Sequence, residues 1–245
     1  MSSFIFSYKS LTFHFFQRPI DSRLFLSQMP EKVSKLFDIS QDFEQNPFTM
    51  FKKWMIQAKN TPEIADPTTM HLATSSTKGR PSVRVVLLKN FNEYGFTFFT
   101  NGNSYKGQNL QENPQAEINF YWAPLGKQIR IFGTVSEIST AESDEYFASR
   151  HITSQMGACV SKQSSELQSY DHLKQEFEEF RNKTPHPQRP QHWKGYRITP
   201  QEFEFWLDGA HRLHLRHKYF LYDGNQVDNQ YTNQNPTWKH KLLYP

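Results

Sequence analysis

The first clear hydrophobic period in the chain is helical. Asn46-Pro47 is typical of a helix N-terminus, because asparagine caps free backbone N–H groups and proline suits the first helical position. Phe48, Phe51 and Met55 follow at helical spacing, so we expect this helix to pack one face on a core.

Further along, short runs rich in Val, Ile and Phe alternate with turn residues, which is typical of antiparallel strands. Residues 78–81 (Lys-Gly-Arg-Pro) form one such turn. The runs cover residues 69–74, 82–89, 96–100, 116–122, 128–136, 195–199, 203–207, 212–222 and 238–243. So many short strands predict a mainly β fold with helices, an α+β architecture built on a β-barrel.

Three more helices are expected, at residues 104–113, 139–150 and 167–180. Ser139 and Glu142 have the spacing of a capping box, which would begin the second of these helices. No internal repeat or linker interrupts the pattern, so the helices and strands are expected to belong to one domain.

Residues 1–45 show no clear period and are expected to form a poorly ordered N-terminal arm ahead of that domain, which would span residues 46–245. The first twenty residues contain Lys9 and Arg18 but no acid, a composition loosely typical of an organelle-targeting segment. An extension without a targeting role is the simpler interpretation, and both stay open.

The bulk composition limits the classes of function. The 245 residues carry a formal net charge of +4, and Cys159 is the only cysteine, which excludes an intrachain disulfide framework and favours a cytoplasmic protein. No run of Lys and Arg is long enough to favour nucleic acid. No stretch reaches the roughly 20 apolar residues of a membrane helix. The mild positive charge also suits an enzyme for phosphorylated small molecules.

Residues 212–216 (Arg-Leu-His-Leu-Arg) are the most unusual local feature. If this segment is a strand, Arg212, His214 and Arg216 share one face and lie about 7 Å apart. Like charges so close repel one another, which favours an anionic partner. A solvated strand face explains the same pattern equally well.

Three other segments place cations where a phosphate could bind. Arg84 and Lys89 bracket a run of valine and leucine and could hold the two ends of an elongated anion. Residues 104–106 (Ser-Tyr-Lys) begin a helix, whose free N–H groups suit phosphate. Tyr146 and Arg150 share a helical face. Charged strand ends that reach water, an ordinary helix cap and a polar surface are the respective alternatives.

Other catalytic templates are missing from the sequence. There is no phosphate loop of the P-loop type and no Gly-x-Ser-x-Gly elbow. His211, His214 and His217 are spaced by three, which would divide them between opposite strand faces, so no metal site is expected.

Taken in order, these segments resemble the pyridoxine/pyridoxamine 5'-phosphate oxidase family over about residues 46–245. Each motif is weak alone, but their joint order and spacing are specific. The motifs are Arg84-Val-Val-Leu-Leu-Lys89, Phe99-Thr100-Asn101, Tyr146-Phe-Ala-Ser-Arg150, Ser154-Gln155, Ser161-Lys-Gln163-Ser164, Phe205-Trp206 and Arg212-Leu-His214.

The resemblance implies an FMN-binding split β-barrel that works as a homodimer, with a C-terminal dimerisation region and two sites at the subunit interface. The implied FMN contacts are Arg84, Val85, Val86, Leu87, Leu88, Lys89, Phe99, Thr100, Lys106, Gln128, Gln163, Ser164, Trp206 and Arg216. The implied substrate contacts are Lys89, Tyr146, Arg150, Ser154, Arg212 and His214.

The implied reaction belongs to vitamin B6 salvage. Pyridoxamine or pyridoxine 5'-phosphate would be oxidised to pyridoxal 5'-phosphate by hydride transfer from substrate C4' to flavin N5, with molecular oxygen as the final electron acceptor. The first four substrate contacts would hold the substrate phosphate. Arg212 and His214, the implied catalytic residues, would lie over the reacting end of the pyridine ring.

The chain departs from the family pattern at Tyr105, Leu215 and Phe132, where the family usually has Arg, Asp and Glu. The N-terminal Arg-x-x-Tyr segment that closes over substrate in the family is not recognisable. Two alternatives therefore stay open: a catalytically impaired protein that binds flavin or pyridoxal phosphate, and a sister flavin oxidase with another substrate, such as those of phenazine biosynthesis.

Overall fold

The computed structural model describes residues 43–222 and 237–245, which belong to one compact unit, Gln41–Pro245. Most of the expected N-terminal arm lies outside these residues. The first described helix, α3 (Pro47–Lys59), begins as expected: the Asn46 side chain accepts a hydrogen bond of 2.8 Å from the Phe48 N–H. Its buried face includes Phe51 and Trp54, so the predicted packing on a core is confirmed.

Nine strands among the described residues form one antiparallel sheet. They are β1 (Thr69–Ser75), β2 (Pro81–Leu87), β3 (Asn90–Asn92), β4 (Gly95–Asn101), β5 (Gln115–Trp122), β6 (Lys127–Glu137), β7 (Trp193–Leu207), β8 (Leu215–Tyr222) and β9 (Thr237–Leu243). Their order is β2-β1-β5-β6-β7-β4-β3, with β8 beside β7 and β9 beside β8.

The segment that follows β2 joins the two ends of this strand order. The Leu88 N–H donates to the Thr68 carbonyl, next to β1, and the Lys89 N–H donates to the Thr97 carbonyl on β4, each at 2.9 Å. The sheet therefore curls round its core as a split barrel, and the predicted mainly β class is confirmed.

Aromatic side chains fill the inside of the curled sheet. Phe51 of α3 packs edge-on against Phe96 at 4.8 Å and Phe120 at 5.3 Å between ring centroids. All three side chains are fully buried. Edge-to-face pairs of this kind add stability beyond the apolar area they bury, which makes the high phenylalanine content part of the fold.

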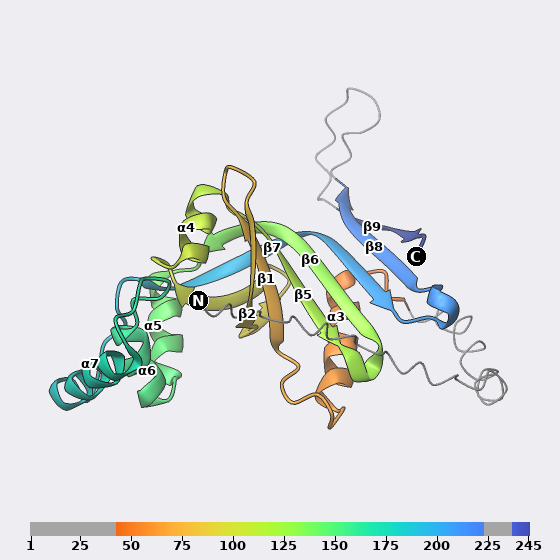
Figure 1. The fold of residues 1–245 in the computed structure, drawn as a ribbon. Coiled ribbons are helices and arrows are strands. Elements are labelled where there is room, and N and C mark those ends of the chain that lie inside the picture. Colours follow the sequence, from red (N-terminus) through yellow and green to blue (C-terminus); the bar gives the residue numbers. More distant parts are fainter. Residues whose placement is uncertain (1–42, 223–236) are drawn as a thin grey trace, which may run out of the picture. The chain divides into compact units, whose positions relative to one another are not determined.

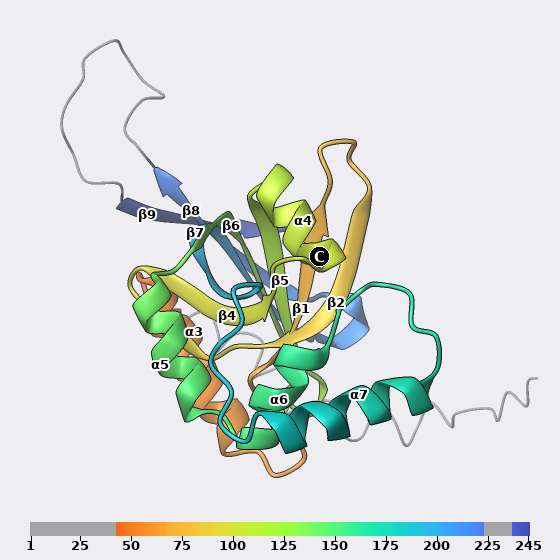
Figure 2. The ribbon, with the colours of Figure 1, turned by 90° about the vertical axis from the view of Figure 1, so that its left-hand side faces the viewer.

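The other helices frame one end of the sheet. They are α4 (Tyr105–Glu112), α5 (Thr140–Ser149), α6 (Ile152–Val160) and α7 (Tyr170–Lys183). Figure 1 shows α5, α6 and α7 gathered at one end of the sheet and β8 and β9 at the other, and Figure 2 looks onto the helical end. Helix α6 was not predicted from the sequence. Among the described residues, no helix is long and apolar enough to cross a membrane.

Two strand predictions were wrong. Residues 195–199 and 203–207 belong to one strand, β7, because a bulge opposite Phe132 and Gly133 accommodates Pro200 and lets pairing with β6 continue. Residues 212–222 are not one strand, since β8 begins only at Leu215. The expected capping box of Ser139 and Glu142 is present at the start of α5.

Candidate active site

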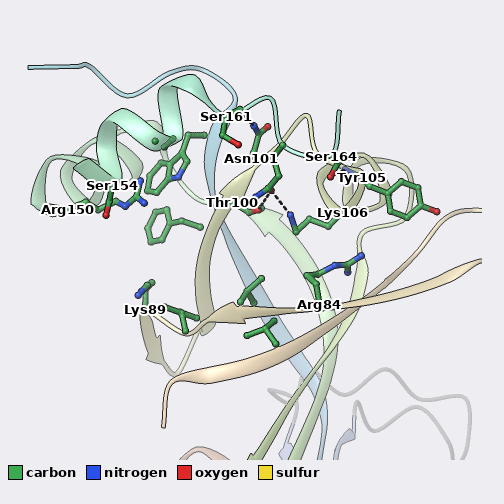
Figure 3. Close-up of a pocket in the computed structure, with 18 of the residues that line it drawn as sticks. Arg84, Lys89, Thr100, Asn101, Tyr105, Lys106, Arg150, Ser154, Ser161 and Ser164 are labelled. Atoms are coloured by element: carbon green, nitrogen blue, oxygen red, sulfur yellow. Dashed lines mark hydrogen bonds between the residues drawn. The ribbon is translucent and has the colours of Figure 1, made fainter. Parts of the chain in front are cut away.

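A cavity of about 1110 Å³ lies between β2, β4 and helices α4, α5 and α6 (Figure 3). It contains thirteen of the residues that the family resemblance assigns to FMN or substrate. These are Arg84, Val85, Val86, Leu87, Lys89, Phe99, Thr100, Lys106, Tyr146, Arg150, Ser154, Gln163 and Ser164. No aspartate or glutamate lines the cavity.

One end of the cavity, here called the Lys106 end, is formed by Arg84, Lys106, Gln163 and Ser164. Arg84 is held by β1, because its guanidinium donates to the Leu72 carbonyl at 3.0 Å and to the Thr74 hydroxyl at 2.8 Å. Lys106 Nζ donates to Gln163 Oε1 at 2.6 Å. These contacts come from segments far apart in the sequence, so only folding brings them together.

Burial disfavours the charged forms of the two cations of the Lys106 end. Burial and, second, the nearby Arg84 guanidinium lower the pKa of Lys106 to about 8, and burial also lowers the pKa of Arg84. The residues that line the cavity include no carboxylate that could neutralise them. A bound phosphate would relieve both effects.

The opposite end, here called the Arg150 end, is formed by Lys89, Tyr146, Arg150 and Ser154. Figure 3 shows Arg150 and Ser154 together above Lys89, across the cavity from Lys106 and Ser164. Arg150 Nη1 is buried without a hydrogen-bond partner among the described residues, and burial lowers the pKa of Arg150. A buried, unpaired donor is the mark of a site that awaits an acceptor.

Stacked aromatic rings form one wall of the cavity. The Phe99 ring lies 4.2 Å from the Tyr146 ring and 4.9 Å from the Trp193 ring, with interplanar angles of 15° and 11°. A planar ligand could rest against such a wall. The cavity is also lined by Asn101, His151 and Trp193, which the sequence did not predict as site residues. Asn101 belongs to the Phe99-Thr100-Asn101 motif. Nothing in the sequence marked His151 or Trp193.

Five predicted site residues lie elsewhere, toward the β8 end of the sheet: Gln128, Trp206, Arg212, His214 and Arg216. Trp206 pairs in register with Gln128 on one side and with Arg216 on the other, and the His214 ring lies 4.6 Å from the Trp206 ring. Gln128, Trp206, His214 and Arg216 are called the Trp206 cluster below. The predicted FMN contact Leu88 has its side chain in the core, 5% exposed.

The expected row of Arg212, His214 and Arg216 on one strand face is wrong. Arg212 ends a short 3₁₀ turn, Ala210–Arg212, and has a φ of 66°, which no strand residue adopts. The turn is tight because Gly209 approaches the Leu213 carbonyl so closely that a Cβ at Gly209 would lie 2.0 Å from its oxygen.

His214 and Arg216 therefore have separate partners in the folded chain. The Gly209 N–H donates to His214 Nδ1 at 3.2 Å, which fixes the imidazole against the turn. Arg216 lies on β8 and donates from Nε to Glu204 at 2.8 Å, a hydrogen bond that raises the pKa of Arg216. This arginine is paired within its own chain, unlike Arg150.

The three departures from the family pattern fall in different places. Tyr105 lines the cavity; its N–H donates to Ser164 Oγ at 3.2 Å, and the Arg80 guanidinium carbon lies 5.8 Å from its ring centroid. Leu215 is the first residue of β8 and pairs with Leu207 of β7. Phe132 lies on β6, opposite the bulge of β7. Only Tyr105 belongs to the cavity.

The described residues contain no group of three or more His, Cys, Asp and Glu side chains that could hold a metal ion. The donors that do converge, Arg, Lys, Ser and Gln, suit phosphate oxygens and not a cation.

The curled sheet and the acid-free cavity define a split-barrel protein with a cavity lined by cations. A family model described as "Pyridoxamine 5'-phosphate oxidase" matches residues 56–184, and one described as "Pyridoxine 5'-phosphate oxidase C-terminal dimerisation region" matches residues 193–245. The chain belongs to the pyridoxamine 5'-phosphate oxidase family.

Individual relatives agree with this assignment. The chain is 48% identical over 198 residues to a pyridoxine/pyridoxamine 5'-phosphate oxidase of Crocosphaera subtropica, covering 80% of this chain and 92% of that protein. A protein of the same name from Pelagibacter ubique is 46% identical over 71% of this chain and 85% of its own length.

Solved structures share the fold. PhzG from Burkholderia lata, crystallised with tetrahydrophenazine-1-carboxylic acid, matches with a TM-score of 0.74 and 31% identity over 84% of this chain and 95% of its own. An FMN-binding protein from Nostoc punctiforme, related to pyridoxamine 5'-phosphate oxidase, matches with a TM-score of 0.62 and 16% identity over 82% and 98% of the two chains, which supports the fold alone.

Proposed function

We propose that the chain is an FMN-dependent oxidase that converts pyridoxamine or pyridoxine 5'-phosphate to pyridoxal 5'-phosphate, with oxygen as the electron acceptor. The observation that carries this proposal is the acid-free cavity with unneutralised cations at both ends. Two phosphorylated ligands, the cofactor and the substrate, would each place a phosphate at one end. The names of the relatives support the same pair of ligands.

The Lys106 end fits the phosphate of FMN. Arg84 and Lys106 would supply charge, and Ser164 with the start of α4 would supply neutral donors. The aromatic wall at Phe99 suits the flat isoalloxazine ring. The cavity volume of about 1110 Å³ is above the roughly 300–1,000 Å³ usual for one small ligand, as a site for two molecules requires.

The Arg150 end would hold the substrate. The unpaired Arg150 guanidinium, with Lys89 and the Tyr146 and Ser154 hydroxyls, would bind the substrate phosphate and orient the pyridine ring toward the wall. Bound FMN would supply the redox chemistry of the oxidation, with oxygen as the final electron acceptor. The protein's own part is to bind, orient and exclude water.

The Trp206 cluster and Arg212 would act in the site of a partner subunit. They lie outside the chain's own cavity, yet the family resemblance assigns them to FMN and substrate. A homodimer resolves this, because two-fold symmetry lets each chain complete the other's site. The match of residues 193–245 to a dimerisation region supports the arrangement.

The proposal predicts a yellow protein. Purified protein with added FMN should show bound-flavin absorbance and should consume oxygen with pyridoxamine 5'-phosphate, but not with unphosphorylated pyridoxamine at the same concentration. Stoichiometric flavin without oxygen uptake on either phosphorylated substrate would indicate the catalytically impaired alternative. A protein that takes up no FMN would contradict the proposal.

A second candidate is a flavin oxidase with another substrate, favoured by the likeness to PhzG. The Arg150 end favours the B6 phosphates, since its two cations and two hydroxyls suit the three oxygens of a phosphate better than the two of a carboxylate. Oxygen uptake with a dihydrophenazine carboxylate and none with either B6 phosphate would select this candidate.

A further inference from the structure

Trp193 is the first residue of β7 and lies beneath the Arg150 end of the cavity. Its side chain is 6% exposed, and its ring stacks on Phe99 while Phe147 meets it edge-on at 5.2 Å between ring centroids. On its backbone, the N–H donates to the Pro190 carbonyl and the carbonyl accepts from Arg189. Trp193 is thus fixed by its main chain and by two rings.

The Arg150 guanidinium lies over this fixed indole. Its central carbon is 4.9 Å from the Trp193 ring centroid and 5.9 Å from the Phe147 ring centroid. Among residues 43–222 and 237–245, no carboxylate pairs with Arg150, and its Nη1 makes no hydrogen bond. The aromatic faces are therefore the main contacts that orient this guanidinium.

The kind of contact matters for phosphate binding. A carboxylate partner would hold the guanidinium but would also occupy its N–H donors and neutralise its charge, as Glu204 does for Arg216. An aromatic face attracts the cation through its π electrons and leaves the N–H edge free. Tryptophan offers the strongest such face.

We propose that Trp193 is a positioning residue that holds Arg150 by a cation–π contact, so that Arg150 meets the substrate phosphate with its donors free. Trp193 itself touches no phosphate; it acts through Arg150. The inference rests on the proposed function to the extent that Arg150 binds a phosphorylated pyridine.

A double-mutant cycle tests this. The dissociation constant of pyridoxal 5'-phosphate is measured by calorimetry on FMN-loaded protein for the wild type, Trp193→Leu, Arg150→Ala and the double variant. Trp193→Leu should weaken binding roughly ten- to thirtyfold. The same substitution in the Arg150→Ala background should change binding less than about twofold, since the cation is already gone.

Two features separate positioning from loss of structure. Binding of unphosphorylated pyridoxal should be unchanged by Trp193→Leu, and in turnover the loss should appear in KM and not in kcat. Trp122→Leu is the matched control, because Trp122 is 3% exposed on β5, away from the cavity lining; it should lower the melting temperature without changing binding.

Should Trp193→Leu not fold, Trp193→Phe decides, because phenylalanine keeps a ring but offers a weaker cation–π face. It should weaken pyridoxal 5'-phosphate binding roughly two- to fivefold, only when Arg150 is present. Equal effects with and without Arg150, or no effect, would overturn the role of Trp193.

The same experiment separates this inference from the proposed function. A wild type that binds pyridoxal 5'-phosphate but oxidises neither B6 phosphate overturns the proposed function and leaves the cycle measurable. A wild type that oxidises pyridoxamine 5'-phosphate, with Trp193 variants that behave like it, overturns the inference alone. A wild type that binds no pyridoxal 5'-phosphate overturns both.

Discussion

At the scale of single residues, the cavity is defined by cations that no carboxylate of its lining neutralises. Arg84, Lys106 and Arg150 all have lowered pKa values, because burial disfavours their charged forms. Arg216, outside the cavity, is instead stabilised by Glu204. The contrast is between cations that burial disfavours and a cation that an ion pair in the same chain stabilises.

The lowered pKa of Lys106 predicts the pH dependence of FMN affinity. With a pKa of about 8, Lys106 is charged at pH 7 and loses its proton as the pH rises through 8. Because phosphate binds the charged form, FMN affinity should fall above pH 8, by at most about tenfold per pH unit for one proton. Quenching of FMN fluorescence on binding, measured from pH 7 to 9.5, gives the dissociation constant.

Lys106→Gln is the control for this pH dependence. It should bind FMN more weakly at pH 7 and show a flat profile over the same range. A wild-type affinity that stays constant from pH 7 to 9.5 would show that the Lys106 charge does not contribute to FMN binding.

At the scale of elements, helix α5 places the Arg150 end. Tyr146 lies near the C-terminus of this helix, and Arg150 is its C-cap residue. The Arg150 N–H donates a hydrogen bond to the Phe147 carbonyl at 3.2 Å. The helix begins with the capping box of Ser139 and Glu142. The local sequence fixes the first residue of α5, and packing fixes its last. Together they determine where Tyr146 and Arg150 enter the cavity.

Removing the cap should weaken substrate binding. Ser139→Ala should cost about 1 kcal/mol of stability, lower the melting temperature by roughly 2–4 °C, and raise KM for pyridoxamine 5'-phosphate. Ser169→Ala is matched, since Ser169 caps α7 by accepting from the His172 N–H at 3.0 Å, but α7 contributes no residue to the cavity lining. It should leave KM unchanged; an equal rise in KM would show that α5 has no special role.

At the scale of the whole molecule, the site proposed here is divided between two chains. The Arg150 end belongs to the chain's own cavity, whereas Arg212 lies in the turn before β8, outside that cavity. If each site takes the Arg150 end from one chain and Arg212 from the other, two chains with different defects could together form one intact site. A site built from a single chain could not be restored in this way.

Subunit complementation tests this arrangement. Arg150→Ala and Arg212→Ala homodimers should each be strongly impaired in turnover. Co-expression of the two variants under different affinity tags should restore activity to about a quarter of wild type, since half of the dimers are mixed and each mixed dimer has one intact site. Purification through both tags should enrich that activity about twofold.

The complementation experiment has a clear negative outcome. Mixed dimers without restored turnover would place both arginines in one chain's site, whereas an Arg212→Ala homodimer with wild-type turnover would exclude Arg212 from the reaction. FMN content, measured by absorbance, should stay near that of the wild type in the Arg212→Ala protein, because Arg212 is assigned to substrate.

The sequence by itself determined the elements that depend on local patterns. The helix after Asn46, the Ser139 capping box and nearly all strands follow from caps, turns and periodicity, which act over a few residues. The quoted motifs also predicted most of the cavity lining, because residues near Arg84 and Arg150 carry the family pattern in contiguous stretches.

Only the tertiary structure determined the positions of Arg212 and Arg216 and the contacts of Arg150. The row at residues 212–216 looked like a strand, but the close approach of Gly209 to Leu213 turns the chain and separates Arg212 from Arg216. Likewise, nothing local marks Trp193 as the residue beneath Arg150. Such contacts join segments distant in sequence, and their geometry is set by packing of the whole sheet, which no short pattern contains.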